Sequence, residues 1–111
     1  EDPYHPGHFG FDEWLSVSNF FDLDPLLSRR GEIEEHQGYS SDIVVDQAVK
    51  FLAQHRDEGA PLFAVIWFGS PHVPFRPLDA DKAPFAALDD TAANPYGEMV
   101  GGDRSVGTLR R

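Results

Sequence analysis

The chain has 111 residues, of which 41% are hydrophobic and 25% charged, a composition typical of a globular domain or of part of a larger one. Nineteen acidic against nine basic residues give a formal net charge of −10, which opposes binding to the phosphate backbone of nucleic acid. The absence of cysteine excludes a disulfide scaffold, a thiolate zinc site and a Cys nucleophile within these residues. No apolar run approaches the ~20 residues of a membrane span.

The first 38 residues predict irregular chain with short elements. Residues 1–10 are rich in Pro, Gly and His and indicate a connecting loop. Asp12 is a possible cap for a short helical turn over residues 12–15. Asp24-Pro25 and Gly31 are turn signals, so residues 22–35 predict a loop or a short hairpin.

A helix is predicted over residues 42–56. Ser40, Ser41 and Asp42 offer capping side chains directly before an apolar-periodic segment. Its apolar face consists of Val45, Ala48, Val49 and Leu52. Gly59 and Pro61 then favour the end of the helix.

Residues 62–68, Leu-Phe-Ala-Val-Ile-Trp-Phe, are apolar at every position. This pattern is typical of a strand that is buried on both faces, as in the centre of a mostly parallel sheet. The predicted fold class is therefore α/β, with part of a mostly parallel sheet flanked by helices. Because parallel neighbours need crossovers that this chain lacks, we expect an incomplete sheet and an internal segment of a larger domain.

The rest of the chain predicts a proline-rich loop over residues 76–95 and a truncated helix over residues 96–111. The residues at helical spacing in that second segment are Tyr96, Met99, Val100, Asp103, Val106 and Leu109. The expected organisation is thus an irregular region (1–38), a unit of helix, strand and active-site loop (39–75), a loop (76–95) and a helix (96–111).

His72 is the strongest candidate for chemistry. It lies between Pro71 and Pro74, just after the predicted strand, where open α/β sheets bind ligands. Its imidazole could donate a hydrogen bond to an anion or pass a proton to a leaving oxygen. The alternative is a histidine that packs at a loop corner. Arg76 could reach an anionic substrate from the same loop, or simply be exposed.

Four segments in the same order resemble the sulfatase family. Residues 70–75, Ser-Pro-His-Val-Pro-Phe after an apolar strand, resemble the family's Pro-His-x-Pro pattern. Residues 10–14, Gly-Phe-Asp-Glu-Trp, residues 38–42, Gly-Tyr-Ser-Ser-Asp, and the helix with Asp103 to Gly107 resemble three further family segments. The four segments are spread over nearly the whole chain.

The resemblance implies a type I sulfatase of the alkaline-phosphatase-like superfamily, a sulfuric ester hydrolase that acts on a sulfated small molecule or glycan. It implies that His72 contacts the substrate sulfate. It also implies a formylglycine nucleophile and a calcium ion in an exported parent enzyme, but the motifs that supply them are absent here, so the isolated chain is expected to be inactive. The alternatives are a phosphatase or phosphonate hydrolase of the same superfamily, or a non-catalytic acidic binding module.

Other residues admit two interpretations, of which the plainer one is favoured. His5 and His8 have a metal-like spacing but lack further ligands, and are interpreted as loop histidines. Asp89-Asp90 is interpreted as a pair of solvated loop acids rather than as the metal-binding Asp-Asp pair of the sulfatase family. Asp103 and Arg104 are expected in surface ion pairs rather than near the site. Trp14 and Trp67 are expected in the core rather than as sugar platforms.

Overall fold

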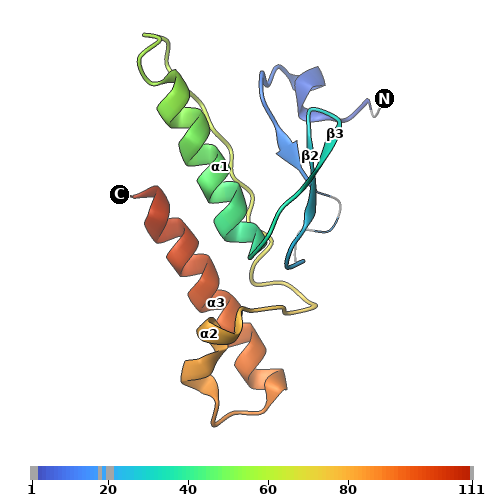
Figure 1. The fold of residues 1–111 in the computed structure, drawn as a ribbon, viewed down its shortest axis with the longest axis vertical. Coiled ribbons are helices and arrows are strands. Elements are labelled where there is room, and N and C mark those ends of the chain that lie inside the picture. Colours follow the sequence, from blue (N-terminus) through green and yellow to red (C-terminus); the bar gives the residue numbers. More distant parts are fainter. Residues whose placement is uncertain (1–2, 18, 20–21, 111) are drawn as a thin grey trace.

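The computed structural model describes residues 3–17, 19 and 22–110. A small sheet and its leading loop form one side of the molecule, and two long helices form the other (Figure 1). The elements in chain order are η1 (Pro6–Phe9), β1 (Leu15–Ser16), β2 (Leu26–Arg29), β3 (Glu32–Glu35), α1 (Ser40–His55), α2 (Asp79–Lys82), η2 (Ala83–Phe85) and α3 (Asp90–Leu109).

The sheet is antiparallel, with strand order β1-β2-β3. Strands β2 and β3 form the predicted hairpin, which turns through Arg30 and Gly31 at φ values of 52° and 98°. Two successive positive φ values are those of a hairpin turn that matches the strand twist. The helical turn predicted at residues 12–15 is wrong, because Leu15 pairs with Arg29 in β1.

Helix α1 confirms the predicted helix and begins two residues earlier, at Ser40. Its N-cap is Tyr39, which makes no side-chain cap hydrogen bond, so the expected capping is not observed. Asp42 lies in the first turn, where its charge favours the helix dipole. Val45 is fully buried and anchors the helix to the rest of the molecule.

The central strand predicted over residues 62–68 is wrong for this chain. The segment is extended and enters none of the three strands found among the described residues. It lies beside the N-terminal region, where Phe63 stacks on Phe11 with ring centroids 6.3 Å apart. Trp67 is 88% exposed, so the prediction that it lies in the core is wrong for this chain. A parallel strand obtains its hydrogen bonds from neighbouring strands, and the strands described here pair only with one another, antiparallel.

Helix α3 begins at Asp90, well inside the predicted loop. The Asp89 side chain caps it by accepting a hydrogen bond from the Ala92 amide at 3.1 Å. Asp90 lies in the first turn, 3.2 Å from Lys82 Nζ. The interpretation of these two acids as loop residues is therefore corrected to a helix start. The short helices α2 and η2 occupy half of the remaining predicted loop.

The face of α3 that packs inward is made of small residues and not of the predicted apolar stripe. Gly97, Gly101 and Ser105 are buried at intervals of four. A Cβ atom on Gly101 would lie 2.9 Å from the Tyr39 ring and 3.1 Å from Asp81 Oδ2. Tyr96, Met99, Val100 and Val106 of the predicted stripe are instead exposed. The glycines of α3 thus permit close approach of α1 and α2 at a cost in helix propensity.

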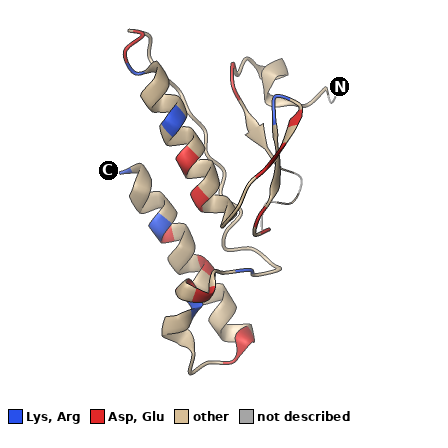
Figure 2. Ribbon diagram, viewed as in Figure 1, with Lys and Arg blue, Asp and Glu red and all other residues tan. Residues whose placement is uncertain are grey.

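Little apolar surface is buried in these residues. The buried hydrophobic side chains are Leu27, Tyr39, Val45 and Ala93. The radius of gyration is 15.6 Å, larger than the ~13 Å of a compact domain of this length. Acidic and basic residues are interspersed over the hairpin and both long helices (Figure 2). None of the helices in the described residues is long and apolar enough to cross a membrane.

Candidate functional site

Residues 70–76, here called the histidine loop, connect the exposed apolar segment to α2. The loop contains His72 between Pro71 and Pro74, which restrict the backbone on both sides. His72 is exposed, and its Nδ1 lies 2.6 Å from the carbonyl oxygen of Val73. A carbonyl only accepts, so Nδ1 carries the proton in this contact. The contact orients the imidazole within the loop.

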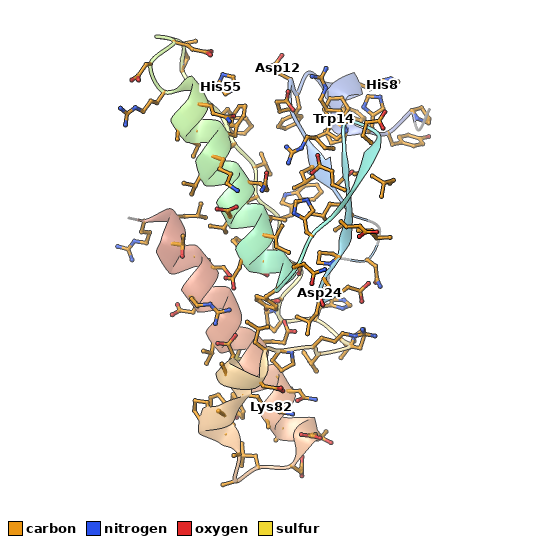
Figure 3. All side chains as sticks on the ribbon, viewed as in Figure 1. His8, Asp12, Trp14, Asp24, His55 and Lys82 are labelled. Atoms are coloured by element: carbon orange, nitrogen blue, oxygen red, sulfur yellow. The ribbon has the colours of Figure 1, made fainter. Side chains whose placement is uncertain are left out.

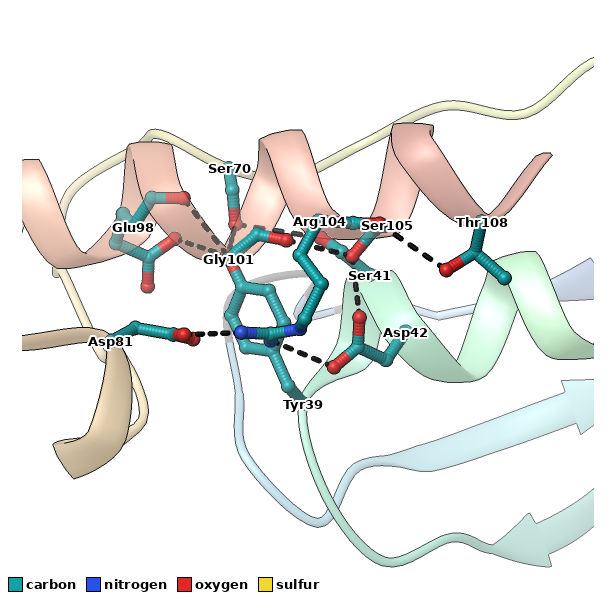
Figure 4. Close-up of polar contacts among 10 residues, drawn as sticks. All are labelled: Tyr39, Ser41, Asp42, Ser70, Asp81, Glu98, Gly101, Arg104, Ser105 and Thr108. Atoms are coloured by element: carbon teal, nitrogen blue, oxygen red, sulfur yellow. Dashed lines mark hydrogen bonds and ion pairs between the residues drawn. The ribbon is translucent and has the colours of Figure 1, made fainter. Parts of the chain in front are cut away.

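The first residue of the loop is held by the start of α1. The Ser70 hydroxyl forms a short hydrogen bond with the Tyr39 hydroxyl and lies 3.5 Å from Ser41 Oγ (Figure 4). Tyr39 and Ser41 are both buried, so water competes little for these contacts. The loop is thereby attached to the first turn of α1.

The last residue of the loop is held by α3. The Arg76 backbone amide donates to Glu98 Oε1 at 2.8 Å. Glu98 is 1% exposed, and its Oε2 accepts from the Tyr39 hydroxyl at 2.9 Å (Figure 4). Glu98 and Tyr39 therefore connect the two ends of the loop through a chain of buried hydrogen bonds.

Tyr39 is protonated under ordinary conditions. Burial raises the pKa of Tyr39 to about 12, and the neighbouring Glu98 carboxylate adds to the increase, while the hydrogen bond with Ser70 opposes it. The phenol therefore serves as the donor to Glu98, and the Ser70 hydroxyl can donate to the phenol oxygen.

A second polar cluster lies beside the first, around Arg104. Its guanidinium donates to Asp42 Oδ2 at 2.8 Å and forms an ion pair with the buried Asp81. Asp42 also accepts from Ser105 Oγ at 2.6 Å. Partial burial alone would lower the pKa of Arg104, but the hydrogen bonds with the two carboxylates raise it. These contacts join α1, α2 and α3 next to the Tyr39 ring.

The predicted partner of His72 in substrate binding, Arg76, uses its side chain elsewhere in this structure. Its guanidinium lies 3.5 Å from Asp22 and is about half exposed. Arg104 forms ion pairs as predicted, but partly buried ones at the helix junction, with Asp42 and Asp81 rather than Asp103. The prediction that placed Arg104 only at the surface is thus corrected.

His5 and His8 lie in the N-terminal region, close to Trp14 and at the opposite end of the molecule from Lys82 (Figure 3). The two imidazoles are 4.1 Å apart, and His5 stacks on Trp14 at 4.9 Å. Among the described residues, His, Asp and Glu side chains form no group of three or more that could hold a metal ion. These histidines pack with an aromatic ring.

An open groove of about 460 Å³ runs along the start of α1. Its lining includes His36, Asp46 and Lys50 but neither His72 nor Arg76. The groove is therefore separate from the histidine loop, and the chemistry of His72 favours the loop as the candidate site.

Tyr39 and Glu98 were not identified from the sequence. Glu98 sits one turn before Gly101 on the small-residue face of α3, and an acid on the packed face of a helix is a signal of a specific partner. Tyr39 belongs to a segment that resembles the sulfatase family, but the sequence alone did not indicate its contacts.

No protein-family model matches the chain, and no curated protein matches it. Two crystal structures of Ps i-CgsB, a carrageenan sulfatase, are similar to it, one free and one in complex with k-i-k-neocarrahexaose. Each has a TM-score of 0.83 and 23% sequence identity, and the matches cover 98–99% of this chain. The chain spans only 30% of the length of that protein. It has a sulfatase-like fold.

Proposed function

We propose that this chain is an internal segment of a sulfatase, a hydrolase of sulfate esters, and that His72 contacts the sulfate group of the substrate. The observation that carries the proposal is the sulfatase-like fold over 98–99% of the chain, at a TM-score of 0.83. The resemblance of residues 70–75 to the family's Pro-His-x-Pro pattern gives the residue role.

The exposed apolar segment supports an internal position in a larger domain. Residues 62–68 expose Phe63, Val65 and Trp67, although the segment is apolar at every position. Contiguous apolar surface of this kind marks an interface. In the complete enzyme we expect other parts of the polypeptide to cover this segment.

The proposed role of His72 follows from its chemistry. With Nδ1 donating to the Val73 carbonyl, the ring contacts the sulfate through Nε2. A protonated imidazole donates a hydrogen bond to a sulfate oxygen and stabilises the negative charge that grows in the transition state. The same proton can pass to the leaving oxygen of the ester. Arg76 is a second candidate for contact with the anion if its side chain leaves Asp22.

The family's formylglycine and calcium are not assigned to residues of this chain. The sequence contains no cysteine, and the described residues contain no group of three or more potential ligands. The residues present do not fit either group. In the proposal, both belong to other parts of the complete sulfatase, and the isolated 111-residue chain is inactive.

The proposed substrate is a sulfated small molecule or a sulfated glycan. A glycan is supported by the similar structure, which was solved in complex with k-i-k-neocarrahexaose. A phosphatase or phosphonate hydrolase of the same superfamily remains the alternative enzyme, and an acidic binding module the alternative without catalysis.

The test uses the complete polypeptide that contains these residues, with an aryl sulfate and the matching aryl phosphate as probes. The sulfate is expected to be the better substrate, and His72→Ala should lower kcat/KM by ~10²–10³ with little change in the unfolding temperature. His55→Ala is a matched control, because His55 pairs with Glu58 at the end of α1. Preference for the phosphate, absence of turnover, or full activity of His72→Ala would contradict the proposal.

A further inference from the structure

We propose that Glu98 is a positioning residue for His72, because its two carboxylate oxygens hold the histidine loop to α1 and α3 at once. The inference rests on the proposed function, since it assigns a role within the same site. The Glu98 carboxylate contacts the Tyr39 hydroxyl and the Arg76 amide. It acts through the backbone of the loop.

The contacts of Glu98 divide between two structural elements. Oε1 accepts from the Arg76 amide at 2.8 Å, at the end of the loop, and Oε2 accepts from the Tyr39 hydroxyl at 2.9 Å. Tyr39 in turn binds Ser70 at the beginning of the loop. The loop is therefore fixed at both ends by one carboxylate and one phenol. Figure 4 shows the connection from Glu98 through Tyr39 to Ser70.

Because the Glu98 carboxylate is buried, it depends on its hydrogen bonds for stability. Glu98 is 1% exposed, and within the part of the chain that the structure describes no Lys or Arg side chain forms an ion pair with it. A buried carboxylate is costly unless hydrogen bonds satisfy it. Its partners, the Arg76 amide and the Tyr39 hydroxyl, are neutral donors. The energetic cost of burying the carboxylate is therefore offset only when the loop occupies this position.

The loop transmits this restraint to His72. Three prolines, Pro71, Pro74 and Pro77, restrict the backbone between and beyond the two tethers. Pro77 also packs closely against α3, since a Cβ on Gly97 would lie 2.7 Å from its side chain. A short stiff segment held at both ends leaves few positions for the imidazole, which is the condition for oriented contact with a substrate.

The first test is a double-mutant cycle on kcat/KM in the complete sulfatase. Glu98→Ala should lower kcat/KM by ~10–10², the scale of a misplaced catalytic group. In the background of His72→Ala the same substitution should change kcat/KM by less than about threefold, because nothing remains to be positioned. Glu98→Gln should restore most of the activity, since its amide oxygen can accept from Arg76 and its NH₂ can donate to Tyr39. Glu35→Ala, on exposed β3, is the control.

The second test measures hydrogen exchange and needs no activity. The Arg76 amide should exchange at least tenfold faster in Glu98→Ala than in the wild type, while α1 and the C-terminal half of α3 keep their protection. If Glu98→Ala does not fold, Tyr39→Phe removes one oxygen from the same connection and should also speed exchange within the loop.

The outcomes separate the two proposals. Unchanged exchange of the loop, or additive effects of Glu98→Ala and His72→Ala on kcat/KM, would overturn the role of Glu98 while leaving the sulfatase proposal intact. Faster exchange in an enzyme that does not hydrolyse sulfate esters would support the tether and refute the proposed function.

Discussion

Two regions of the molecule satisfy their physical requirements very differently. At the junction of α1 and α3, the buried side chains of Glu98 and Ser105 find donors and acceptors from separate segments of this chain. The buried Asp81 pairs with Arg104 through Oδ1, while its Oδ2 has no hydrogen-bond partner among the described residues. Residues 62–68, a few residues before the histidine loop, expose large apolar side chains and pair with none of the described strands.

The difference shows which contacts a segment can complete by itself. A hydrogen bond needs one partner at about 3 Å, and short helices and loops of this chain supply it. The burial of an apolar strand requires covering surface on both faces, which the elements described here do not provide. The polar junction can therefore be nearly complete where the sheet is not, with Asp81 Oδ2 as its one unsatisfied oxygen among the described residues.

The largest expected effect tests whether residues 62–68 become buried in the complete polypeptide of the proposed sulfatase. Trp67→Ala should then destabilise the enzyme by about 3–5 kcal/mol, the usual cost of truncating a buried aromatic residue. Denaturant unfolding measures this value, with exposed Gln54→Ala on α1 as the control. A change below about 0.5 kcal/mol, typical of a surface position, would mean that the exposure seen here persists.

A smaller effect tests the polar junction through pH. Because the pKa of Tyr39 is raised to about 12 in the folded state, folded Tyr39 holds its proton more tightly than the unfolded chain, whose tyrosine pKa is about 10. The contribution of Tyr39 to the free energy of unfolding is therefore fully present below pH 10. It should fall by about 2–3 kcal/mol as the pH rises to about 12.

The measurement compares unfolding free energies of wild type and Tyr39→Phe from pH 9 to 12. The difference between the two proteins should shrink over that range. Tyr96→Phe, at an exposed position of α3, is the control and should run parallel to the wild type. A parallel course for Tyr39→Phe as well would place Tyr39 outside the buried network.

The smallest effect concerns the glycines of α3, and it has opposite signs at two positions. Gly101→Ala should destabilise the protein by about 1–2 kcal/mol, because the new Cβ would lie 2.9 Å from the Tyr39 ring and the overpacking exceeds the gain in helix propensity. Gly107→Ala meets no atom within 4 Å and should stabilise by up to about 1 kcal/mol. Thermal unfolding of both variants provides the test, and equal signs would contradict the close packing at Gly101.

The sequence predicted those elements whose signals are local. The hairpin at residues 22–35 followed from turn residues, and α1 followed from its apolar spacing. The start of α3 was missed because Pro95 indicated a loop, whereas the helix runs through Pro95 and forgoes the hydrogen bond that an amide at this position would donate. The apolar pattern of residues 62–68 predicted a strand, but pairing depends on partners distant in sequence, which a local pattern does not specify.

The candidate site divides in the same way. His72 was identified from its position after an apolar run and between two prolines, and its role as a sulfate contact remains a prediction. Glu98 and Tyr39 are 59 positions apart and meet only through the packing of α3 against the start of α1. The glycines that allow this packing give no signal of it in the sequence, because helix propensity describes a helix without neighbours and counts glycine only as a cost.

The small residues of α3 also act as a spacer. The histidine loop is attached at Ser70 to the start of α1 and at Arg76 to α3, so the separation of the two helices sets the distance that the loop must span. Gly101 and Ser105, which face Tyr39 and Asp42, determine how closely the helices approach. A single methyl group added to this face of α3 would therefore stretch the loop and shift the imidazole of His72. The position of the imidazole thus depends on the small size of residues in α3.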